Sequence, residues 1–303
     1  MVTSISSSGQ TGTILQQNSL LEVQYTQETE ETSSGLKSPT FDGIASDSQQ
    51  LLSLQSQYNR ITSQTANATS AQNQVNEISS TLGTISTLLS SVMSNLSEAV
   101  STTGSSSTGS TQATLQVELS QLVGLLNTQY GDAYLFSGSA TNTQPVNLSA
   151  SSYNPLADPT TPDTGYYQGN DQTAKVQPSD ALTVNYGITA DNPAFEEALR
   201  GLAVAIANPT DNASLEQAYT LVQQASAGVT TLTTQTASQS SLLSSQLNIN
   251  SQTLNYLDTS MGDLRNVDVA QISTQLSELE NQLDASFSAL AKLLNLNLSS
   301  YLK

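Results

Sequence analysis

The sequence of 303 residues contains no cysteine, no histidine and no tryptophan. A disulfide, a zinc site built from Cys and His, a haem and a catalytic triad that uses His are therefore excluded. Charge is also scarce, because Asp, Glu, Lys and Arg make up 11% of the residues against about 25% in an ordinary soluble domain. A polar sequence with 36% hydrophobic residues predicts an elongated molecule rather than one with a thick, round core.

Basic residues are much rarer than acidic ones. Lys and Arg number 7 against 25 Asp and Glu, and the formal net charge is −18. The basic residues stand singly along the chain and form no patch that could neutralise phosphates, so we expect no nucleic-acid partner. They are Lys37, Arg60, Lys175, Arg200, Arg265, Lys292 and Lys303.

Long hydrophobic runs are absent as well. No run approaches the roughly 20 residues that a membrane helix requires, so we expect no membrane insertion. Residues 1–13 are mainly Ser, Thr and Gly with isolated Val2 and Ile5, and the first basic residue is Lys37. This is not the pattern of a cleaved secretory signal. We therefore expect a protein that is cytoplasmic or exported by another route.

Apolar residues at steps of three and four predict most of the chain to be helical. The pattern predicts a long helix over 44–102, a second over about 112–130, a short one over 191–206 with Asn192 as its cap, and two more over about 212–257 and 269–301. A weaker signal runs through Ile14, Leu21 and Tyr25 to about residue 32. Between the helices, residues 131–190 are rich in Pro and Gly, and Leu182, Val184 and Tyr186 alternate as in a strand.

The expected fold class is therefore mainly α: a long antiparallel helical rod with paired N- and C-terminal helices and a small β-rich inserted domain. We divide the chain into an N-terminal assembly and export segment (1–43), rod helices (44–135), the β-rich insert (136–190), further rod helices (191–262) and a C-terminal assembly helix (263–303).

The apolar stripes at the two ends of the chain are the candidate functional surface. A rod that is only a few helices wide cannot bury two such stripes, and exposed apolar surface of this size normally marks an interaction site. The alternative is that the two ends pair only with each other inside one chain. The predicted assembly interface consists of Ile14, Leu21, Tyr25, Ile272, Leu276, Leu279, Leu283, Phe287, Leu290, Leu294, Leu298 and Tyr301.

Catalytic and ligand-binding motifs find little support. Ser34–Lys37 has the SxxK spacing of serine acyl-enzymes, but no KTG follows it. The sequence contains no phosphate-binding glycine motif. We therefore expect no enzyme, no cofactor and no metal. Glu28, Glu30 and Glu31 are interpreted as a solvated helix face, because acid–base catalysis needs carboxylates that converge on a cleft. A second group is interpreted as loop residues, because its spacing matches no calcium loop: Asp158, Asp163, Asp171 and Asp180.

Several segments resemble the bacterial flagellin family. Ser33–Lys37, followed by Ser38-Pro39 and Asp42, resembles the family's link between its N-terminal helix and its rod helix. The other segments are similar to the hook-associated members of the family, which lie at the junction of hook and filament. They are Tyr130–Gly138, Tyr167–Asp171, Pro193–Arg200, and the C-terminal Leu283–Lys292 with Leu296–Leu302.

The resemblance implies a flagellin-like fold and a structural adaptor on which flagellin polymerises. It implies export without a cleaved signal, by the flagellar type III pathway, to an extracellular position in the flagellum, with ends that are unfolded in the monomer. The implied partners are further copies in a ring or helical tube, hook-associated protein 1, flagellin or the adjoining axial proteins, the export apparatus and a chaperone. A flagellin filament subunit is the alternative, and a coiled-coil surface or secretion-tip protein a more distant one.

Overall fold

The structure is a computed structural model that describes residues 2–40, 45–101 and 108–301. Within these residues the chain is mainly α-helical, as expected, with α1 (Val2–Ser34), α2 (Ala45–Ser101), α3 (Thr108–Leu126), α4 (Pro193–Ala207), α5 (Asn212–Arg265) and α6 (Val269–Tyr301). Two compact units are formed, one from Met1–Arg60 with Thr253–Lys303 and the other from Ile61–Gln252. In the described ranges no helix combines the length and apolarity needed to cross a membrane.

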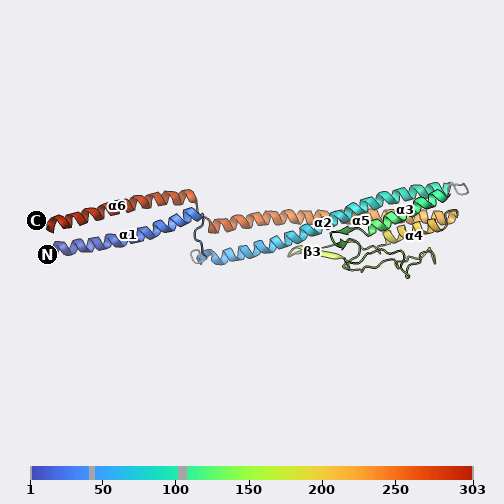
Figure 1. Cartoon of the computed structure of the whole chain (residues 1–303), viewed down its shortest axis with the longest axis horizontal. Coiled ribbons are helices and arrows are strands. Elements are labelled where there is room, and N and C mark those ends of the chain that lie inside the picture. The colour runs from blue at the N-terminus through green and yellow to red at the C-terminus, as the bar shows by residue number, and fades with distance from the viewer. Residues whose placement is uncertain (1, 41–44, 102–107, 302–303) are drawn as a thin grey trace. The chain divides into compact units, whose positions relative to one another are not determined.

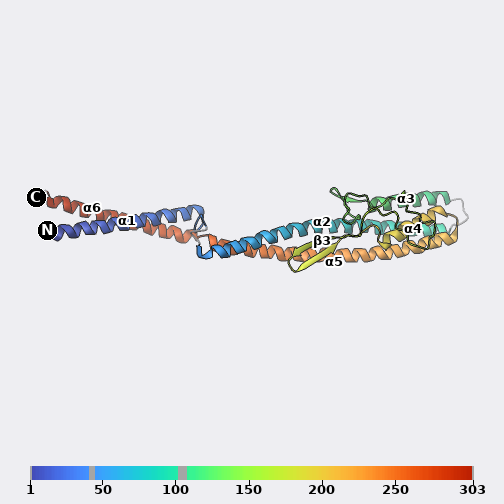
Figure 2. The same ribbon diagram turned by 90° about the horizontal axis from the view of Figure 1, so that it is seen from below.

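The first unit brings the two ends of the chain together. Helices α1 and α6 lie side by side and run antiparallel, as both views show (Figures 1 and 2). The beginning of α2 and the end of α5 belong to the same unit, where Leu51 and Met261 are buried in one small cluster with Tyr58 packed against it. Gly35 turns the chain after α1 with a φ of 70°, a conformation that only glycine adopts at little cost.

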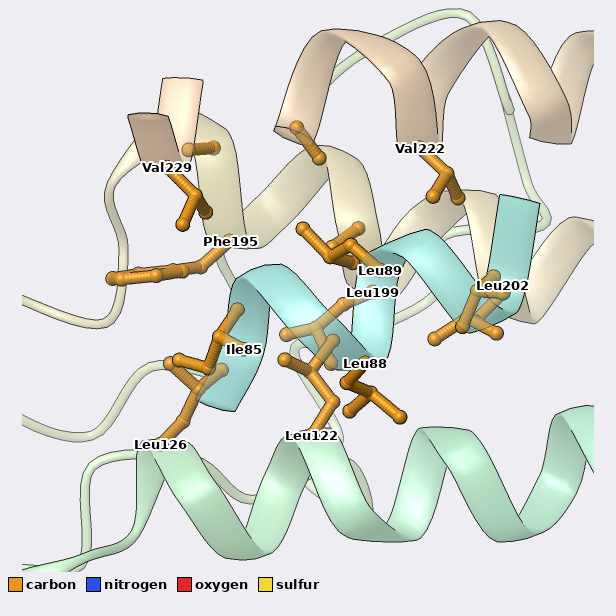
Figure 3. Close-up of a cluster of buried hydrophobic side chains, with 14 of the residues drawn as sticks. Ile85, Leu88, Leu89, Leu122, Leu126, Phe195, Leu199, Leu202, Val222 and Val229 are labelled. Atoms are coloured by element: carbon orange, nitrogen blue, oxygen red, sulfur yellow. The ribbon is translucent and has the colours of Figure 1, made fainter. Parts of the chain in front are cut away.

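The second unit contains the main hydrophobic core. Side chains from α2, α3, α4 and α5 point toward one another there (Figure 3). Leu89, Leu122 and Leu199 have no exposed surface, and the rings of Phe136 and Phe195 meet edge to face with centroids 5.8 Å apart. Apolar residues spaced three and four apart in the sequence therefore form a closely packed hydrophobic core here.

Strands occur only in the segment between α3 and α4, among the described residues. The hairpin of β1 (Gln129–Tyr130) and β2 (Ala133–Tyr134) comes first, and β3 (Ala174–Ser179) then pairs antiparallel with β4 (Leu182–Tyr186). Val176 and Val184 face each other in that hairpin and are buried with Ala71, Val75 and Leu243 of α2 and α5.

The rest of the insert has less strand than its composition suggested. Residues 135–173 form turns, with one isolated bridge between Val146 and Tyr167. Proline cannot donate to a strand ladder, and Asp and Asn side chains satisfy backbone N–H groups there instead: Asp163, for example, accepts from the N–H groups of Asn154 at 2.6 Å and Gly165 at 2.8 Å. The insert is therefore a small hairpin attached to a folded loop.

Helix positions follow the expected ranges, with differences at four ends. Helix α1 extends to Ser34, α3 spans Thr108–Leu126 instead of about 112–130, and α5 continues to Arg265 instead of ending near Leu257. The end of α3 is set by β1, which begins at Gln129. The predicted cap is confirmed, since the Asn192 side chain accepts from the Ala194 N–H at 3.1 Å.

Candidate assembly interface

A row of α1 side chains faces α6. The least exposed positions of α1 recur at steps of three and four, which is the heptad spacing of a coiled coil. Only some of these residues are apolar, so this side of the pair is weakly hydrophobic. The row consists of Thr11, Ile14, Asn18, Leu21, Tyr25, Glu28 and Thr32.

The facing row of α6 has the same spacing and is much more apolar. Leu279 is its one apolar residue in the buried class, at 7% exposure, and the others are half-buried. The row consists of Ile272, Leu276, Leu279, Leu283, Ser286, Leu290 and Leu293. We call the two rows together the seam.

Polar contacts fix how the two helices lie. The Ser286 hydroxyl donates to the side-chain oxygen of Asn18, and the Tyr25 hydroxyl donates to a Glu280 carboxylate oxygen at 2.9 Å. This hydrogen bond to Glu280 raises the pKa of Tyr25, because the phenol must keep its proton to donate it. The predicted α1 residues Ile14, Leu21 and Tyr25 therefore lie on the face of α1 that is turned toward α6 and its Leu283.

Glu28 is a weak point of the seam. One of its carboxylate oxygens is buried without a hydrogen-bond partner. Burial raises the pKa of Glu28, and the negative charges of Glu31 and Glu278 raise it further. An acidic side chain in a helix–helix contact disfavours pairing when it is ionised.

Phe287 and Leu294 do not belong to the seam. They are 46% and 53% exposed, because the heptad places Ser286 and Leu293 against α1 and leaves the next residue of each turn beside the contact. Leu15, Leu20 and Val23 of α1 are also exposed. The predicted stripe therefore divides into a seam and an outer apolar row. Leu298 and Tyr301 lie in α6, but their side chains are outside the described part of the structure.

The internal pairing left open by the sequence is present in the structure. This pairing buries the seam side chains only in part, since most of the apolar seam residues are half-buried rather than buried. The ends are helical here, whereas the resemblance implied ends unfolded in the monomer. Pairing within the chain and association with neighbours are thus compatible, because the outer row stays exposed.

The link after α1 is tied to the link before α6. Leu36 and Asn266 form an isolated antiparallel bridge, in which the Lys37 N–H donates to the Arg265 carbonyl at 2.8 Å and the Val267 N–H to the Gly35 carbonyl at 3.1 Å. The Lys37 ammonium donates to the Asp263 carbonyl at 2.7 Å. We call this contact the junction.

The junction also explains the SxxK spacing. The Ser34 hydroxyl accepts from the Leu36 N–H at 3.2 Å, while the Lys37 ammonium is directed to the Asp263 carbonyl. The two side chains serve backbone contacts in a turn, so the motif has a structural role here.

Two of the family-like segments meet in the second unit. The Asn170 side-chain oxygen accepts from the Ser139 N–H at 3.0 Å and from the Gln172 N–H at 3.1 Å. A side chain at Gly138 would come within 2.2 Å of the Asn170 carbonyl oxygen, so glycine is required there. The segments Tyr134–Gly138 and Tyr167–Asp171 therefore form one structural contact.

Two side chains of α4, which form a buried ion pair with each other, hold the insert by hydrogen bonds. Arg200 and Glu196 lie 2.8 Å apart with side-chain exposures of 6% and 3%. Arg200 also donates to the Pro159 carbonyl at 2.7 Å, and Glu196 accepts from the Asp163 N–H at 3.0 Å. The predicted loop residue Asp163 thus holds the insert on the bundle. No cluster of metal-ligating side chains occurs among the described residues.

No protein-family model and no curated protein matches the sequence. Solved structures do match: one described as a flagellar hook-associated protein from Vibrio parahaemolyticus has a TM-score of 0.64 at 18% identity, over 74% of this chain and 100% of that one. The chain has the hook-associated fold. FlgL from Bacillus cereus has a TM-score of 0.56 at 16% identity, over 70% of this chain and 99% of that one.

The hook-associated fold was predictable from the sequence, but part of the seam was not. Asn18 and Ser286 are not predicted because they are polar, and Leu293 is not predicted because a step of four from Leu290 leads to Leu294 instead. A strict heptad count from Leu279 leads to Ser286 and then to Leu293, and that count is the signal that separates the seam from the outer row.

Proposed function

We propose that this chain is a structural subunit of the bacterial flagellum, of the hook-associated protein 3 type, which seats flagellin polymerisation at the junction of hook and filament. The observation that carries the proposal is the hook-associated fold, shared over 74% of this chain. The family-like segments support it as well, because two of them are joined by the Asn170 N–H, which donates to the Ser137 carbonyl at 3.2 Å.

The proposed mechanism is burial of apolar surface between neighbouring subunits. The α1–α6 pair presents Phe287 and Leu294 to solvent, and contacts that repeat from one copy to the next without closing produce a helical tube. Proposed partners are further copies of the chain, hook-associated protein 1 and flagellin or the adjoining axial proteins. We also propose an extracellular position, export through the flagellar apparatus with a chaperone, and no catalytic activity.

Labelling the protein in swimming cells tests its place in the flagellum. A single labelled point at the end of each hook supports the proposal, and loss of the gene should stop swimming and release flagellin monomers into the medium. Label along the whole filament would instead identify a flagellin subunit. Unchanged swimming without the gene would favour a coiled-coil surface or secretion-tip protein.

Charge placed on the ends tests the assembly interface. Leu283→Asp or Leu290→Asp should abolish incorporation at the hook, because a buried carboxylate opposes helix pairing. The second unit should keep its fold, measured by the urea unfolding transition. Leu156→Asp is a matched control, since Leu156 is 45% exposed in the insert. Normal filaments from the Leu283 and Leu290 variants would contradict the proposed interface.

A further inference from the structure

The apolar seam does not define its own register. On α6 nearly every seam position is Leu or Ile, and these positions repeat with the heptad. If α6 moved along α1 by one heptad, Leu21 would pass from the level of Leu283 to that of Leu276. Leucine would face leucine in both arrangements, so apolar packing distinguishes them poorly.

One layer of the seam is different. Ser286 is the only polar seam residue of α6 among the described side chains, and it faces Asn18. Asn18 is 4% exposed, and its amide nitrogen has no hydrogen-bond partner. The Ser286 hydroxyl is therefore the contact that satisfies the Asn18 side-chain oxygen.

A one-heptad shift would remove that contact. Asn18 would then face Leu279, which offers no hydrogen-bonding group, and its whole amide would be buried without a partner. A single buried Asn is known to set the register of coiled coils in this way, because only one alignment gives it a polar neighbour.

We propose that the Asn18–Ser286 layer determines the register in which α1 pairs with α6. The junction also restrains the register, but it follows the C-terminal end of α1. It lies about 27 Å from Asn18, at a rise of about 1.5 Å per residue. It acts only when both helices belong to one chain. The proposal concerns the helix pair itself and does not depend on the proposed function.

Engineered disulfides can measure the register directly, because the full chain contains no cysteine of its own. The native pair combines Leu21→Cys with Leu283→Cys, and the shifted pair combines Leu21→Cys with Leu276→Cys. Cysteines bridge only when their Cα atoms are within about 7 Å. Oxidation of the dilute protein should therefore cross-link the native pair and leave the shifted pair reduced.

Asn18→Leu is the first test variant. It should raise the ratio of shifted to native cross-linking about ten-fold, since the cost of an unpartnered buried amide no longer opposes the shift. Thr32→Leu is the matched control. It also adds a leucine to the α1 side of the seam, but the Thr32 hydroxyl bonds to the Glu28 carbonyl of its own helix, so the ratio should not change.

Exchanging two residues of α6 is the sharper test. In the chain with Ser286→Leu and Leu279→Ser, the seam composition is unchanged but the serine faces Asn18 only after the one-heptad shift. The shifted pair should then cross-link more than the native pair. Circular dichroism must show unchanged helix content in each variant.

Two results would overturn the proposal. If the ratio is unchanged in the Asn18→Leu chain and the native pair still dominates in the exchanged chain, the junction fixes the register and the polar layer does not. If neither pair cross-links in a chain with full helix content, α1 and α6 do not pair in this alignment.

Discussion

The α1–α6 pair and the helical bundle of residues 61–252 use the same three-and-four spacing of apolar residues but bury them differently. In the bundle, Leu82, Leu89 and Leu199 are completely buried. Among the described side chains of α6, by contrast, the best-buried apolar residue is Leu279 at 7% exposure, and Phe287 is 46% exposed. The bundle encloses each side chain between several helices, whereas a two-helix seam stays open at its edges. The pattern in the sequence thus predicts a helix face, and the number of neighbours decides whether that face becomes a core.

The largest expected effect lies in the bundle. Arg200→Met should destabilise the second unit by about 3–5 kcal/mol, because it leaves the Glu196 carboxylate buried without its partner. Urea unfolding followed by circular dichroism measures this loss. The double variant with Glu196→Met should lose less, since no charge remains buried. An unchanged urea midpoint for Arg200→Met would mean that the insert is not held by this pair.

The comparison itself is tested by one substitution made in both regions. Leu199→Ala should cost about 2–5 kcal/mol, as for a fully buried leucine in a packed core. Leu279→Ala should cost less, because solvent already reaches the seam. Native-state hydrogen exchange of α4 and α6 amides reports each loss separately. Equal losses would show that the seam is as well packed as the bundle.

Limited proteolysis compares the opening of the two regions without any substitution. The ends should be removed first, leaving a fragment from about residue 40 to about residue 265, because a poorly buried helix pair opens more often than a core. Mass spectrometry of the early products identifies the cuts. First cuts inside the bundle, with α1 and α6 intact, would mean that the bundle opens more readily than the α1–α6 pair.

The smallest expected effect concerns the pH dependence of the seam. The pKa of Glu28 is raised in the folded chain, so its protonated form favours folding, and the helix pair should gain stability as the pH falls through that pKa. Glu28→Gln should stabilise the pair at neutral pH and weaken this acid-side gain. Thermal melting of the α1–α6 helices at several pH values measures it.

The control for this pH effect is Glu30→Gln, a change at an exposed position of the same helix. It should leave the acid-side gain in place. Equal responses from the two variants would assign the effect to the general negative charge of α1 rather than to burial of Glu28.

Features that depend on residues close together in the sequence could be predicted, and contacts between distant residues could not. Apolar spacing located the helices, and Asn192 before Pro193 located the start of α4, because both depend on neighbouring residues alone. The role of Asn170 could not be predicted, since its partner Ser139 is distant in the sequence and no spacing rule joins them. Ser286 was missed for a different reason: a small polar residue in a leucine row looks like an interruption until the facing helix is known.

The contact between Ser139 and Asn170 means that the loop leaves the bundle and returns to it at one place. Lengthening a loop whose ends are already held together costs little, about 0.6 kcal/mol of chain entropy for each doubling. Proteins that keep this closure can therefore carry outer segments of very different size and chemistry on an unchanged set of helices. Surface variation could then accumulate at that point without any change in the helices of the second unit.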